Sequence, residues 1–248
     1  MSLSISLAAE PIAHLGSFPI TNTLLASWIA VAVLLVLAFA IRRRVAAVPS
    51  GVQNVSESVI EGALGLMDSV TGDRKMSERF FPLVMTLFLF IVTANWLGLM
   101  PLFGTVGIKE VHDGEETIIP LLRTVNSDLN VTFALAAVSV IATQVFGVLI
   151  VGGRKYSQRF FNLKNPIFTF VGILELFSEI AKMLSFSFRL FGNVFAGEVL
   201  LVVVAGLIPY IVPLPFMFLE LFVGAIQAFV FAVLTLGFLR IATVESHE

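Results

Sequence analysis

Long apolar runs separated by short polar segments make up most of the chain. The first run covers residues 22–41, and residues 80–103 and 129–151 form the next two. Two longer runs, 165–205 and 212–243, contain charged side chains within their apolar sequence. Since one membrane crossing needs about 20 consecutive apolar residues, this pattern predicts an all-α integral membrane protein with about five membrane helices.

Residues 51–72 have a different pattern, in which apolar residues recur at spacings of three and four. Val52, Val55, Val59 and Leu66 follow this spacing, whereas the polar residues fall largely elsewhere on the helical wheel. The periodicity is typical of an amphipathic helix that is too polar to span a bilayer. We expect this helix to lie at the inner membrane interface, although packing against a soluble partner would give the same pattern.

The segment 165–207 is too long for a simple crossing. A single helix of about 40 residues would be about 60 Å long, which is twice the thickness of the hydrocarbon layer. The segment therefore either breaks into two helices or crosses with a steep tilt, and hydropathy does not choose between these possibilities. The final run, 212–243, then returns across the membrane.

The basic residues predict the orientation of a single membrane domain. Arg42–Arg44 follow the first run, and a second basic group follows residues 129–151. Because basic residues gather on the cytoplasmic side of a membrane, we expect the segment 1–20 outside and the C-terminus inside. The loop 104–128 is acidic, which fits the outside, and its basic residues are Lys109 and Arg123.

The composition supports a membrane protein and excludes several kinds of site. The 248 residues are 58% hydrophobic and 13% charged, with a mean hydropathy of +0.99, whereas soluble domains carry about 25% charged residues. A net charge of -2 argues against nucleic acid as a partner. The absence of cysteine excludes disulfides and thiolate metal sites, and the three histidines are far apart. We therefore expect no metal site and no cofactor.

A stripe of polar residues runs along the segment 165–205. Glu175, Lys182 and Arg189 are seven residues apart, so they lie on one side of a helix with slow drift. A charge at mid-membrane costs roughly 2.5–3.5 kcal/mol on insertion scales, which suggests an ion path facing a partner helix or water. Glu175 and Glu179 are also candidate structural partners of Lys182. The same side of the helix carries Ser185 and Asn193.

Arg189 is the most informative residue of this stripe. An arginine side chain does not release its proton in proteins, so Arg189 would act as a fixed positive charge. At about 4 Å from a carboxylate, with an effective dielectric constant near 20, the attraction is about 4 kcal/mol. A structural pairing with a glutamate is the alternative, but no carboxylate lies three or four residues away. We therefore favour a functional role.

Glu198 lies nine residues beyond Arg189, on the other side of a straight helix. We expect it to face the last helix, where Glu220 and Gln227 are seven residues apart. Two carboxylates on adjacent helices would form an access path for ions, because burial allows carboxyl groups to exchange protons near neutral pH. A hydrogen bond between the two carboxyl groups that simply joins the helices is the alternative. We expect Gln227 to bond across this helix pair near Arg189.

These residues resemble a known family. The sequence SFRLFGNVFAGE at 187–198 resembles the signature of subunit a of F-type ATP synthases, and QAFVF at 227–231 resembles the last helix of that family. The pair Glu175 and Lys182 also matches its pattern. The likeness extends over most of the chain from about residue 50.

The resemblance implies a non-catalytic stator subunit without a nucleotide site. Two long tilted helices would follow a ring of c subunits, and two half-channels would serve the ring carboxylate. Arg189 matches the arginine that separates the half-channels, Gln227 its partner glutamine and Asn193 a polar position beside it. Glu198 and Glu220 match positions where members carry Glu or His in different combinations.

The same resemblance implies partners and a location. The expected partners are the c-ring, a b-type peripheral stalk, other ATP synthase subunits and the lipid bilayer. The expected location is the plasma (inner) membrane of a bacterium. Two other functions stay open from the residues alone, which are a self-contained ion channel or secondary transporter and a purely structural anchor.

Overall fold

The computed structural model describes residues 9–16, 18–43, 45, 51–100, 103, 107–112, 115–160, 166–209 and 211–243. This part of the chain forms seven α-helices, one short 3-10 helix and two β-hairpins. Residues 1–8 and 17 of the outer segment, Arg44 and the polar C-terminal tail after Thr243 lie outside the described residues.

Five helices are long and apolar enough to cross a membrane, and they confirm the all-α membrane fold. They are α1 (Asn22–Arg42), α3 (Arg74–Gly98), α4 (Leu129–Val151), α6 (Pro166–Leu207) and α7 (Pro213–Thr243). Within each helix the backbone groups bond to one another, which is the condition for crossing lipid.

The third helix begins earlier than the sequence predicts. We expected a run starting at residue 80, but α3 starts at Arg74, where the Asp73 side chain accepts a hydrogen bond from the Lys75 backbone N–H. The first turns are polar, so hydropathy does not detect them. As a result, Pro82 lies inside the helix and not near its start, where it removes one backbone hydrogen bond.

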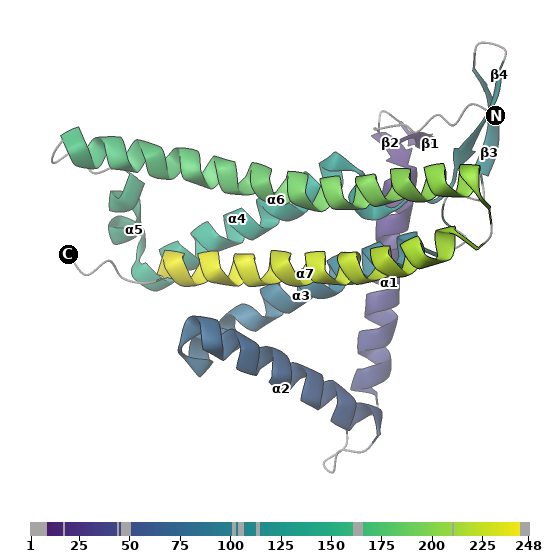
Figure 1. Ribbon diagram of the computed structural model, residues 1–248. Helices are drawn as coiled ribbons and strands as arrows, with labels where there is room; N and C mark the ends of the chain where they lie inside the picture. Colours follow the sequence, from purple (N-terminus) through teal and green to yellow (C-terminus); the bar gives the residue numbers. More distant parts are fainter. Residues whose placement is uncertain are drawn as a thin grey trace.

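Helix α6 is unbroken, so the possibility of two separate helices is wrong. It contains 42 residues and is therefore about 63 Å long. Helix α7 contains 31 residues and returns antiparallel beside it (Figure 1). Both helices run across the direction of α1 (Figure 1). If α1 crosses the bilayer directly, α6 and α7 must be steeply tilted, because their lengths exceed the hydrocarbon thickness.

Two β-hairpins, which were not predicted, lie in the outer segment and in the loop between α3 and α4. The first pairs β1 (Pro11–Leu15) with β2 (Phe18–Thr21), and the second pairs β3 (Gly107–His112) with β4 (Glu115–Pro120). They lie at the same end of the molecule (Figure 1), where the Asn22 side chain donates to the Pro120 carbonyl (3.3 Å). The short helix α5 (Gly153–Phe160) was also not expected.

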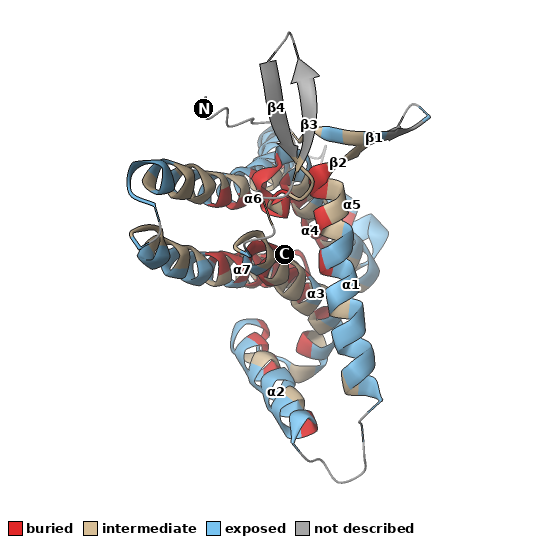
Figure 2. Cartoon of the chain, turned by 90° about the vertical axis from the view of Figure 1, so that its right-hand side faces the viewer, coloured by how far each residue is buried: buried red, intermediate tan, exposed pale blue. Residues whose placement is uncertain are grey.

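The core lies between α3, α4, α6 and α7. Its centre includes Ile91, Phe186, Leu190 and Phe231, and the Phe186 and Phe231 rings are 4.8 Å apart between centroids. The sides of α6 and α7 that face away from the other helices carry exposed apolar side chains (Figure 2). These sides are therefore available to lipid or to a partner.

The amphipathic helix α2 (Val52–Thr71) corresponds to the expected interfacial helix. Its buried residues include Leu64 and Met67, and Met67 packs in one cluster with Phe80 and Leu236. Its other apolar residues, such as Val55, stay exposed. The helix thus packs on α3 and α7 with one part of its apolar surface and leaves the rest open.

Candidate functional site

Arg189 lies on the open side of α6. Phe186 and Leu190 are buried in the core, whereas Arg189, between them in the sequence, is exposed. Its side chain is exposed and has no hydrogen bond or ion pair with any residue that the structure describes. A guanidinium on an apolar helix surface that lacks a partner in its own chain is well placed to face a charge on another molecule.

One turn further along, a hydrogen bond joins the two long helices. The Asn193 side-chain Nδ2 donates to Gln227 Oε1 (2.7 Å), and Gln227 is buried. The bond crosses from α6 to α7 as the sequence predicts for Gln227. It holds the helix pair together directly beside Arg189.

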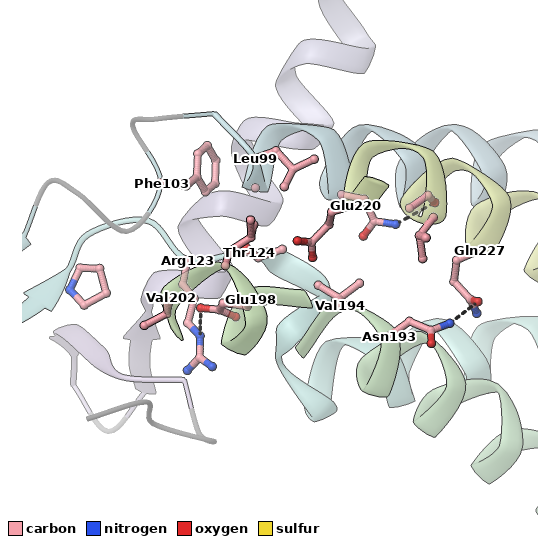
Figure 3. A pocket seen from close by; sticks show the side chains of 16 residues that line it. Leu99, Phe103, Arg123, Thr124, Asn193, Val194, Glu198, Val202, Glu220 and Gln227 are labelled. Atoms are coloured by element: carbon pink, nitrogen blue, oxygen red, sulfur yellow. Dashed lines mark hydrogen bonds and ion pairs between the residues drawn. The ribbon is translucent and has the colours of Figure 1, made fainter. Parts of the chain in front are cut away.

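A pocket of about 250 Å³ lies between α3, α6, α7 and the loop before α4. Glu198 lines it from α6 and Glu220 from α7, and Gln227 lines its other end (Figure 3). The close packing depends on Gly197, because a Cβ atom at that position would overlap the Glu220 carboxyl group. The structure thus brings Glu198, Glu220, Asn193 and Gln227 to one cavity.

The direct partner of Glu198 is not on the last helix. Arg123 Nε lies 3.6 Å from Glu198 Oε1, in an ion pair with the loop that precedes α4 (Figure 3). The expectation that Glu198 turns to Glu220 and Gln227 is therefore correct only in that they line the same pocket. Sequence reasoning missed Arg123, although an arginine in an acidic outer loop was a usable signal.

Asn95 lines the pocket and is held in place by a second asparagine, Asn126. Asn126 Nδ2 donates to Asn95 Oδ1 (2.7 Å), and Asn95 Nδ2 donates to the Gly224 carbonyl (3.0 Å). Both amides are buried. Since Gly224 lies between Glu220 and Gln227 on α7, this chain of bonds fixes the polar edge of α7 against α3.

The remaining polar residues of α6 gather at its other end. Lys182 Nζ donates to Glu179 Oε1 (2.7 Å), and Arg159 of α5 donates to Glu175 Oε1 (2.6 Å). Glu175 therefore does not pair with Lys182, because seven residues separate them by about 10 Å along the axis. Ser185 is exposed on the open side of α6.

Helix α5 is attached beside this group through Tyr156. Its hydroxyl donates to Gln144 Oε1 (2.6 Å), and its ring fills the space left by Gly147. Burial raises the pKa of Tyr156, so this hydroxyl stays protonated and remains a donor. In the described ranges no group of three His, Cys, Asp or Glu residues could hold a metal ion.

Comparisons with known proteins relate this sequence to a known family. A family model described as ATP synthase A chain matches residues 24–240. ATP synthase subunit a of Moorella thermoacetica is 34% identical over 228 residues, which cover 91% of this chain and 92% of the relative. ATP synthase subunit a of Gloeobacter violaceus is 34% identical over 227 residues, 92% of this chain and 85% of the relative. The resemblance carried by the sequence motifs is thereby confirmed.

Proposed function

The chain belongs to the ATP synthase A chain family, and from this premise we propose that it is the stator of a rotary motor. It guides protons to and from the carboxylates of a rotating ring of c subunits. Proton flow then drives ring rotation and ATP synthesis in a separate catalytic head. One elementary charge crossing 100 mV supplies about 2.3 kcal/mol, so several protons are needed for each ATP.

The observation that carries this proposal is the position of Arg189. Its guanidinium is exposed on the open side of α6 and has no partner among the described residues. An unpaired cation in a membrane is costly, which supports a partner carboxylate on another chain. The exposed apolar sides of α6 and α7 supply a surface for that chain (Figure 2).

The pocket beside Arg189 serves as the outer half-channel. It contains Glu198 and Glu220, which exchange protons, and it reaches Gln227, which bonds to Asn193 next to Arg189. Arg189 stays charged and therefore cannot relay a proton. It separates this path from the one on the other side and prevents protons from crossing without the ring.

The polar group at the other end of α6 lies along the inner half-channel. It contains Glu175, Glu179, Lys182 and the exposed Ser185. The outer path and the inner path are thus offset along α6, as a rotating carrier between them requires. The chain itself is a non-catalytic subunit, and a b-type peripheral stalk holds it against the torque of the ring.

This proposal assigns an orientation. The N-terminus lies outside a bacterial inner membrane and the C-terminus lies in the cytoplasm. The basic residues Arg42, Arg154 and Arg159 then lie inside, as the positive-inside rule requires. The pocket with Glu198 lies near the second hairpin, whose Pro120 lines it, and it therefore belongs to the outer side.

The test is ATP-driven proton pumping by the assembled complex in liposomes. We expect Arg189→Ala to abolish pumping, while Arg240→Ala, an arginine in the last turn of α7, retains it. Liposomes that contain this chain without c subunits should be impermeable to protons. Full pumping by Arg189→Ala would contradict the proposal, and proton flux without the ring would favour a self-contained channel.

A further inference from the structure

Arg123 is the second arginine of the site and lies at the outer wall of the pocket. Its side chain is only 7% exposed, and that of Glu198 is 28% exposed. Besides its ion pair with Glu198, Arg123 Nε donates to Ser127 Oγ (3.2 Å). A charge this deeply buried is expensive unless it is paired, so the contact constrains both side chains.

The loop that carries Arg123 is firmly attached to α3. Asn126 bonds to Asn95 (2.7 Å). Next to Arg123, the Thr124 side chain packs on Gly98 so closely that a Cβ there would lie 2.6 Å from Thr124 Cγ2. These contacts restrict the backbone at Arg123, so the position of its guanidinium is restricted as well.

The two carboxylates of the pocket have different environments. Glu198 has Arg123 beside it, whereas Glu220 has no ion pair with any residue in the described ranges. The second oxygen of Glu198, Oε2, is buried and has no hydrogen-bond partner among the residues that the structure describes. Arg123 thus holds one oxygen of Glu198, while the other oxygen has no hydrogen-bond partner among the described residues (Figure 3).

We propose that Arg123 is a positioning residue of the outer half-channel, which holds the Glu198 carboxylate at the α6 wall of the pocket. It acts through Glu198 and does not itself carry protons, because its guanidinium stays charged. This inference rests on the proposed function, since it assigns a role within the outer path. It adds a residue from the loop before α4 to a site otherwise built from α6 and α7.

A mutant cycle on the assembled complex tests this role. Passive proton flux through the complex in liposomes is measured for Arg123→Gln, Glu198→Gln and the double variant. We expect Arg123→Gln to lower the flux roughly tenfold, the scale of losing a contact that orients a functional group. The double variant should be no slower than the slower single variant, because Arg123 acts through Glu198. Arg123→Lys, which keeps the charge, should recover part of the flux.

Two controls separate positioning from loop stability. Ser127→Ala removes the hydroxyl to which Arg123 Nε donates, and we expect it to retain the flux. The amount of subunit that copurifies with the c-ring verifies assembly for every variant. The inference is overturned if Arg123→Gln keeps normal flux while Glu198→Gln is impaired, if the two effects multiply, or if Ser127→Ala is equally slow. Normal flux in Glu198→Gln would instead contradict the proposed function.

Discussion

The Glu220 carboxyl group of α7 packs against Gly197 of α6, in the space that a side chain at residue 197 would occupy. This close approach places Glu220 beside Glu198, the next residue on α6, within one pocket. A glycine at this point therefore has a geometric role, because it allows two carboxylates on different helices to share a cavity. It also makes the position of Glu220 sensitive to a single methyl group.

Gly197→Ala should displace Glu220 and impair the outer path. The added Cβ overlaps the carboxyl group, so the Glu220 side chain must move, and displacing a functional group by about 1 Å can reduce a rate roughly a hundredfold. We expect passive proton flux through the assembled complex to fall at least tenfold. The control is Gly65→Ala on α2, where a Cβ meets no atom within 4 Å. Equal proton flux in Gly197→Ala and Gly65→Ala would show that the Glu220 side chain can move without impairing proton conduction.

Removing the hydrogen bond between Asn193 and Gln227 should weaken ATP-driven proton pumping, whichever of the two residues is changed. Asn193→Leu and Gln227→Leu each remove the 2.7 Å hydrogen bond and leave the partner amide unpaired, which costs about 1–3 kcal/mol. We expect each variant to lower ATP-driven pumping severalfold, and the double variant to lose no more than the worse single one. Asn130→Leu, at an exposed position on α4, is the control. Fully additive losses would mean that the two amides act independently.

Gly172→Ala should loosen the attachment of α5 to α6 without touching the pocket. The new Cβ would meet the Phe160 backbone carbonyl, and backbone cannot move aside as a flexible side chain does. We expect a loss of stability of roughly 1–3 kcal/mol, measured as a lower thermal unfolding midpoint of the complex in detergent. Gly153→Ala, whose nearest neighbour would be Val148 Cγ1 at 3.8 Å, should leave the midpoint almost unchanged. A normal midpoint for Gly172→Ala would mean that α5 can move away from α6.

The sequence by itself determined the five crossings and the polar positions of α6 and α7. A bilayer imposes a minimum length on apolar helices, so hydropathy alone locates α1, α4 and α7 to within a residue or two of the observed bounds. Helical periodicity likewise places Glu198 on the other side of α6 from Arg189, because nine residues along one helix turn a side chain by about half a turn.

Contacts between distant segments were decided only by the tertiary structure. Arg123 and Glu198 belong to separate parts of the chain, and no periodicity connects a loop to a helix that packs on it later. The same reason explains why Glu175 pairs with Arg159 and not with Lys182. The unbroken course of α6 also depends on its neighbours, because the packing of Phe186 and Leu190 against α3, α4 and α7 fixes a helix that hydropathy could equally have divided.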